Sequence, residues 1–205
     1  MPRLLSRFLV SFLSLVVGAS FARAQRALQV TVVGSTNDSR VAAVQEAVAF
    51  WNRQLDQTGA HVQLGPVRVI DDPISDGTLS DLNAAILDGQ SPHGLAPLVA
   101  QIPGEVVVAL SGADLMSFGI PWREGAKGFG ALRRGDVAPL SLPNVARNAI
   151  AHELGHVLGL SHNADPRTLM CGRPAPCRPD SFASTTVRFF PLTLSDERQL
   201  RERWP

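Results

Sequence analysis

The sequence predicts an α+β fold, because strand-like and helix-like segments alternate early in its 205 residues. Residues 27–34 alternate apolar and polar side chains, residues 39–55 carry apolar side chains at helical spacing, and residues 61–71 are again strand-like. Residues 105–110 form a nearly continuous apolar run, which is typical of a strand covered on both faces. These observations predict a sheet with helices packed against it.

The first predicted helix, residues 39–55, is amphipathic, and either Asp38 or Ser39 is suited to cap its N-terminus. Its apolar positions at helical spacing are Val44, Val48, Trp51 and Leu55. The strand that follows at residues 61–71 contains Gly65-Pro66, a pair that should interrupt its pairing.

Residues 72–104 are rich in Asp, Gly, Ser and Pro, so we expect a long surface excursion with one short helix at residues 79–87. Its acids could bind calcium, but their spacing matches no standard calcium loop, and solvated loop acids are the simpler interpretation. These acids are Asp71, Asp72, Asp76, Asp81 and Asp88. His61 and His93 could likewise hold a second zinc ion, but neither lies in the His-x-Asp pattern of such sites, and solvated or hydrogen-bonded histidines are the simpler interpretation.

The segment at residues 128–133 is predicted to be an edge strand of the sheet. Substrate peptides often add to such an edge through main-chain hydrogen bonds, so Phe129, Gly130 and Ala131 are candidate substrate-binding residues.

A second long helix should run from Asn144, as N-cap, to about Leu158. Its core-facing residues would be Ile150, Leu154, Val157 and Leu158. The opposite face carries His152 and His156, which are four residues apart and therefore project from the same side of the helix. Both imidazoles can bind one metal ion, and Glu153 between them is placed to take a proton from a metal-bound water.

His162 can serve as a third ligand, because Gly159 allows the chain to leave the helix and turn back. Three protein ligands leave the fourth position of a zinc ion open, which is the mark of a catalytic site. A helix with incidental surface histidines is the alternative interpretation.

The extended motif resembles that of the metzincin zinc proteases, and the sequence Thr168-Leu169-Met170 resembles their Met-turn. The spacing is most similar to the matrixin branch. The resemblance implies zinc as the cofactor, with ligands His152, His156 and His162, Glu153 as general base, and Met170 beneath the metal. It also implies a twisted mixed sheet, a long first helix, an active-site helix and a small C-terminal subdomain after the third histidine. Residues 192–203 resemble the short closing helix of this family. From its residue type alone, Met170 would more often be an ordinary core residue, so its role rests on the resemblance.

The chain departs from the matrixin pattern at Cys171-Gly172, where matrixins usually carry Tyr-Pro at the wall of a substrate pocket. It contains no tyrosine, which the astacin-like and serralysin-like branches place near their metal. In matrixins the position of Asn148 often lies at the floor of the specificity pocket; an exposed helical asparagine is the alternative. Cys171 and Cys177, an even and closely spaced pair, predict a disulfide, with two free thiols or a further metal site as alternatives.

Residues 1–24 resemble a signal peptide, with Arg3 and Arg7 before an apolar run and Ala22-Arg23-Ala24 as a cleavage pattern. An uncleaved anchor is the alternative, but about a dozen apolar residues are fewer than the roughly 20 that span a membrane. We therefore expect export, to the periplasm or the extracellular space, of one catalytic domain at residues 25–205.

The expected mature chain has 16 basic and 18 acidic residues, so its charge gives no reason to expect nucleic acid or an anionic membrane as partner. We expect a monomeric zinc endopeptidase that acts on proteins or peptides. A catalytically silent zinc-binding module and an exported zinc scavenger are the alternatives, and neither requires Glu153.

Overall fold

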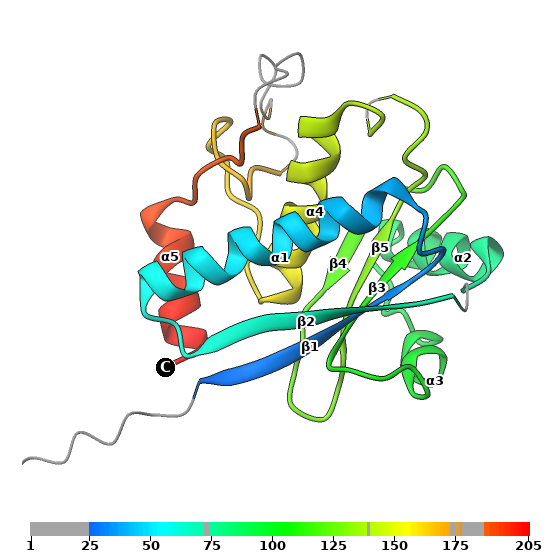
Figure 1. The fold of residues 1–205 in the computed structure, drawn as a ribbon, viewed down its shortest axis with the longest axis horizontal. Helices are drawn as coiled ribbons and strands as arrows, with labels where there is room; N and C mark the ends of the chain where they lie inside the picture. Colours follow the sequence, from blue (N-terminus) through cyan, green and yellow to red (C-terminus); the bar gives the residue numbers. More distant parts are fainter. Residues whose placement is uncertain (1–24, 72–73, 139, 173–174, 176, 178–186) are drawn as a thin grey trace, which may run out of the picture.

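The computed structural model describes residues 25–205 except 72–73, 139, 173–174, 176 and 178–186 (Figure 1). The predicted signal peptide, residues 1–24, lies outside the described residues. Among the residues described, no helix is both long enough and apolar enough to span a bilayer.

The structure is α+β, with five strands and five helices in the described part of the chain. The elements in order are β1 (Arg26–Val33), α1 (Ser39–Thr58), β2 (Val62–Ile70), α2 (Asp76–Leu87), α3 (Leu95–Val99), β3 (Val106–Leu110), β4 (Phe118–Ile120), β5 (Gly128–Leu132), α4 (Pro143–Val157) and α5 (Leu194–Arg203). The strand–helix–strand start, the two long helices and the closing helix are confirmed.

The five strands form one mixed sheet in the order β2-β1-β3-β5-β4. All neighbours are parallel except β4, which runs antiparallel to β5. The prediction that residues 128–133 form an edge strand is therefore wrong, because β5 pairs with β3 on one side and β4 on the other. The short strand β4 occupies the edge.

The β1–β2 pairing shifts register at Gly65-Pro66, since Leu28 pairs with Leu64 but Val30 pairs with Val67. One extra residue on β2 is a β-bulge. The strand nevertheless continues from Val62 to Ile70, so the glycine–proline pair shifts the pairing and does not end the strand.

Helices α1, α4 and α5 cover one face of the sheet and share its larger hydrophobic core (Figure 1). Side chains alternate along β3, so Val106 and Val108 enter this core while Val107 and Ala109 point to the other face. Trp51 of α1 is fully buried, and its indole N–H donates to the carbonyl of Ala151, 2.8 Å away. This bond fixes α1 against the middle of α4.

The second face of the sheet is covered by α2 and α3, which corrects the prediction that residues 72–104 form a surface excursion. The two helices contribute Leu79, Leu82, Leu95 and Val99 to a second core cluster. Because β3 is apolar on both sides, its second face needs such a cover. The short helix predicted at residues 79–87 is confirmed as α2, which begins three residues earlier, whereas the five-residue helix α3 was not predicted.

Helix α4 begins at Pro143, whose fixed φ and missing N–H suit the first helical position. Its N-cap is Leu142, without a capping side chain, so the prediction that Asn144 is the N-cap is wrong. The side chain of Asn144 instead accepts hydrogen bonds from the Arg147 side chain and from the Arg188 amide.

The buried guanidinium of Arg40 joins α1 to the carboxyl ends of β3 and β5. Its Nη1 donates to the carbonyls of Ser111, Leu132 and Arg133 at 2.7–3.2 Å, and the same side chain pairs with the N-cap Asp38. The hydrogen bond from this guanidinium lowers the pKa of the Asp38 carboxyl.

Replacing Arg40 with methionine should lower the free energy of unfolding by about 3 kcal/mol. The carbonyls at the ends of β3 and β5 and the carboxylate of Asp38 would lose their hydrogen-bond donor. Denaturant unfolding measures this loss. Arg53→Met, an exposed arginine on the same helix, should change stability by less than about 0.5 kcal/mol. Equal effects of the two substitutions would contradict this account of Arg40.

Asp76, in the first turn of α2, accepts hydrogen bonds from the Ser111 hydroxyl and the Gly112 amide at 2.7 and 2.8 Å. The bond from Ser111 holds the pKa of this carboxyl below its usual 3.8. The ionised form is favoured in the folded state, so its stabilisation is present above pH 3.8 and is lost as the pH falls through the lowered pKa. Asp76→Asn should therefore be less stable than wild type at pH 7, with a difference that shrinks below about pH 4.

Unfolding free energies measured between pH 7 and pH 3 test this, with the exposed α2 residue Asp81→Asn as the control. A difference between wild type and Asp76→Asn that stays constant over this range would exclude the proposed linkage.

Candidate metal centre

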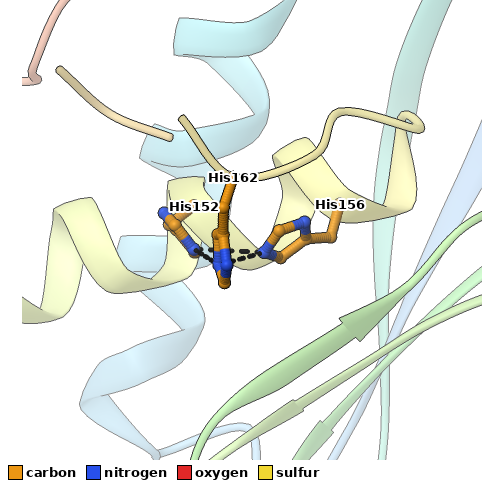
Figure 2. A group of neighbouring side chains, drawn as sticks. All are labelled: His152, His156 and His162. Carbon is orange, nitrogen blue, oxygen red and sulfur yellow. Dashed lines mark hydrogen bonds between the residues drawn. The ribbon is translucent and has the colours of Figure 1, made fainter. Parts of the chain in front are cut away.

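Three imidazoles converge on one point beside α4 (Figure 2). The Nε2 atom of His156 lies 3.1 Å from that of His152 and 3.0 Å from that of His162, and the remaining pair is 3.0 Å apart. A tetrahedral zinc ion with bonds of about 2.0–2.1 Å separates its nitrogen ligands by about 3.3 Å. The predicted trio is thus brought together at a spacing that fits one zinc ion.

The other ring nitrogens of the two helical histidines contact backbone carbonyls. Nδ1 of His152 lies 2.7 Å from the Leu169 oxygen, and Nδ1 of His156 lies 2.8 Å from the Leu160 oxygen. A carbonyl can only accept, so each Nδ1 carries the proton and, in the neutral ring, each Nε2 keeps its lone pair. These carbonyls orient two lone pairs toward the same point, as in metal-binding histidines.

Burial among protein atoms lowers the pKa of His156, and the neighbouring His162 acts in the same direction, while the hydrogen bond to Leu160 opposes them. The neutral imidazole, which is the metal-binding form, is therefore favoured at this position.

His162 reaches the centre because the chain turns back directly after α4. Gly159 has φ of 98°, a left-handed conformation that suits glycine. The segment is then held by Asn163, whose amide donates to the Met170 carbonyl and whose carbonyl accepts from the Gly172 amide. The Asn163 side chain also donates to the buried carboxylate of Asp196 at the start of α5.

Glu153 follows the first ligand on α4 and is 9% exposed. The adjacent strand β4 packs tightly on the same helix: a Cβ atom added at Gly119 would lie 2.8 Å from the Cβ of His156. The sheet edge therefore lies beside the histidine trio. This strand was not predicted from the sequence, because the three residues Phe118–Ile120 are too few to show a periodicity.

Met170 is fully buried directly beneath α4. A Cβ atom added at Gly155 would lie 3.0 Å from the Met170 Cε and 2.9 Å from Trp51, so the thioether fills the space left by this glycine. The preceding residue, Leu169, supplies the carbonyl that orients His152. The turn at residues 168–170 thus lies against the first metal ligand.

Asn148 is buried and 3% exposed, so the alternative of an exposed helical asparagine is wrong. Its amide nitrogen donates to the carbonyls of Asn144 and Arg188, and its amide oxygen accepts from the Phe190 amide at 2.8 Å. These bonds attach the segment before α5 to α4, and they occupy the polar atoms that a pocket floor would offer to substrate.

The remaining candidates are the predicted substrate-binding residues and the residues considered for a second metal site. The side chains of Phe129 and Ala131 are fully buried in the core under α2 and α3. Gly130 lies between them on the interior strand β5, whose main chain pairs with β3 and β4. His61 and His93 are exposed. In the described part of the chain, the acids of residues 71–88 form no group able to hold a metal ion.

Cys171 and Cys177 form the predicted disulfide. It closes a loop directly after Met170, and Cys171 pairs with Asn163, the neighbour of His162, through an isolated parallel bridge. The covalent link is thus one residue away from the backbone that holds the third ligand.

No protein-family model and no curated protein matches this chain. Among solved structures, it is similar to archaemetzincin from Methanopyrus kandleri, with 16% identity and a TM-score of 0.48 over 88% of this chain and 95% of that one. It is also similar to metalloproteinase-II from Bacteroides fragilis (14%, 0.48), covering 89% of this chain and 55% of that chain, so it spans about half of that protein. A zinc-dependent peptidase from Methanocorpusculum labreanum has 14% identity and a TM-score of 0.35, over 86% of this chain and the whole of that one.

The purified chain should bind one zinc ion, and His156→Ala should lose it, because two imidazoles without the third hold zinc far more weakly. Metal analysis after dialysis measures the stoichiometry. His93→Ala, which removes an exposed histidine outside the trio, is the matched control and should retain one zinc ion. Tight stoichiometric zinc in His156→Ala would contradict the ligand set.

Proposed function

We propose that this protein is a secreted zinc endopeptidase of the metzincin type, similar to the matrixins, with a small C-terminal subdomain after His162. The observation that carries the proposal is the convergence of three Nε2 atoms on one point while backbone carbonyls hold the opposite nitrogens of His152 and His156. Three protein ligands leave one zinc position for water, which is the arrangement of catalytic zinc sites.

In this mechanism zinc, when bound, supplies a Lewis acid that polarises the peptide carbonyl and lowers the pKa of water toward about 7. Glu153, next to the first ligand, accepts a proton from the attacking water. As the C–N bond breaks, the protonated Glu153 donates that proton to the leaving amine nitrogen. The carboxylate is thereby regenerated for the next cycle.

The free edge of β4 is the surface we propose for the substrate main chain. It replaces the interior strand β5 that the sequence favoured, and it packs against α4 at Gly119, next to His156. An extended peptide can pair with such an edge through main-chain hydrogen bonds, which hold its backbone without regard to its sequence. Its scissile carbonyl would then lie beside the metal.

We also propose that the protein is exported from the cytoplasm. The disulfide between Cys171 and Cys177 is compatible with an oxidising compartment, and residues 1–24 have the pattern of a cleaved signal peptide. In such a compartment the mature chain, residues 25–205, would act as a monomer on proteins or peptides.

Glu153→Gln should keep one zinc ion but lose hydrolysis of an unfolded protein by about 10²–10⁴-fold, because the amide cannot accept the proton of water. Glu202→Gln, an exposed helical glutamate on α5, should cleave at the wild-type rate. Substantial cleavage by Glu153→Gln would refute the role of this residue.

Wild-type protein that retains zinc without cleaving any protein or peptide substrate would instead identify a silent zinc-binding module. Ready loss of the metal to a weak chelator would identify a scavenger.

A further inference from the structure

Gly172 lies against the imidazole of His162. The residue is buried, and a Cβ atom added to it would lie 2.6 Å from the His162 Cδ2 and closer still to Cγ and Nδ1. The optimal separation of nonbonded carbon atoms is about 3.5–4.0 Å. The ring of the third histidine therefore occupies the space that any side chain at position 172 would need.

The backbone does not itself require glycine at this position. Gly159, at the end of α4, has φ of 98°, whereas Gly172 is outside the left-handed region that favours glycine. The φ angle at position 172 therefore does not exclude alanine. The steric conflict of an added side chain is thus with the ring of His162.

The segment that carries Gly172 is more firmly held than the ring it touches. The Gly172 amide donates to the Asn163 carbonyl at 3.0 Å, and the neighbouring Cys171 is tied to Cys177 by the disulfide. His162 is exposed, so its ring has space to move outward. A methyl group at position 172 would consequently displace the imidazole more easily than the segment.

We propose that Gly172 is a positioning residue for the third metal ligand. Its lack of a side chain lets the His162 ring lie where Nε2 is 3.0 Å from the Nε2 atoms of His152 and His156. This inference rests on the proposed metal centre, and it assigns a role to a residue at which the chain departs from the matrixin pattern.

Gly172→Ala in the mature chain tests the proposal through the zinc dissociation constant, measured by competition with a chelator. We expect zinc affinity to fall by about 10–100-fold, the range seen when a residue that orients a ligand is changed. The visible spectrum of the Co(II)-substituted protein should also change, because its d–d bands depend on the number and arrangement of the ligands. Gly94→Ala is the matched control, since a Cβ there meets no atom within 4 Å.

A double-mutant cycle on the metal-free protein separates positioning from a requirement of the fold. If the ring is the obstacle, any loss of stability from Gly172→Ala should disappear in a His162→Ala background. An equal loss in both backgrounds would overturn the proposal, and so would a zinc affinity of Gly172→Ala within about twofold of wild type.

These outcomes are distinct from those for the proposed function. Wild-type protein that binds zinc but hydrolyses nothing would leave the role of Gly172 intact. Wild-type protein that binds no zinc would overturn both.

Discussion

Two hydrogen bonds from histidine rings to backbone carbonyls are the interaction on which the site depends. The oxygens of Leu169 and Leu160 accept from Nδ1 of His152 and His156, which leaves both Nε2 lone pairs directed toward the same point. Without these acceptors either ring could adopt the other tautomer or rotate, and three neighbouring imidazoles would not be assembled as ligands. The position of the segment that contains Leu169 is therefore as important to the site as the helix that carries the histidines.

That segment is positioned by interactions from distant parts of the chain. Leu169 donates its amide to the Pro191 carbonyl, and Asn163 connects the third-ligand segment to Asp196 at the start of α5. Asp196 in turn accepts from the Thr193 amide in the capping box of α5. The closing helix thus contributes to the metal centre without supplying a ligand, because it fixes the turn that orients one.

Close packing at glycines is the second physical feature of the site. Gly119 lets β4 approach His156, Gly155 makes room for Met170, and Gly172 makes room for His162. At each position a side chain would meet atoms at distances that real contacts do not allow. These glycines thus let a strand, a thioether and a backbone segment pack closely against α4 and the histidine trio.

Much of the fold and the trio could be predicted from the sequence, and two errors have different physical causes. Helical spacing in residues 39–55 and the apolar run before β3 located α1 and the central strand, because these signals come from neighbours in the chain. The edge position assigned to β5 was wrong, since strand order depends on pairing with β3 and with a three-residue strand. The prediction that Asn144 is the N-cap was wrong for a local reason, because Pro143 already occupies the first helical position.

The chemistry of the centre followed from local spacing: His152 and His156 share a helix face wherever that helix lies, because 3.6 residues make one turn. The approach of His162 to His152, the Leu169 carbonyl that orients His152, and the burial of Asn148 followed from folding, because each involves residues ten or more positions apart. Helix periodicity is a property of consecutive residues, whereas such contacts exist only after separate elements have packed together.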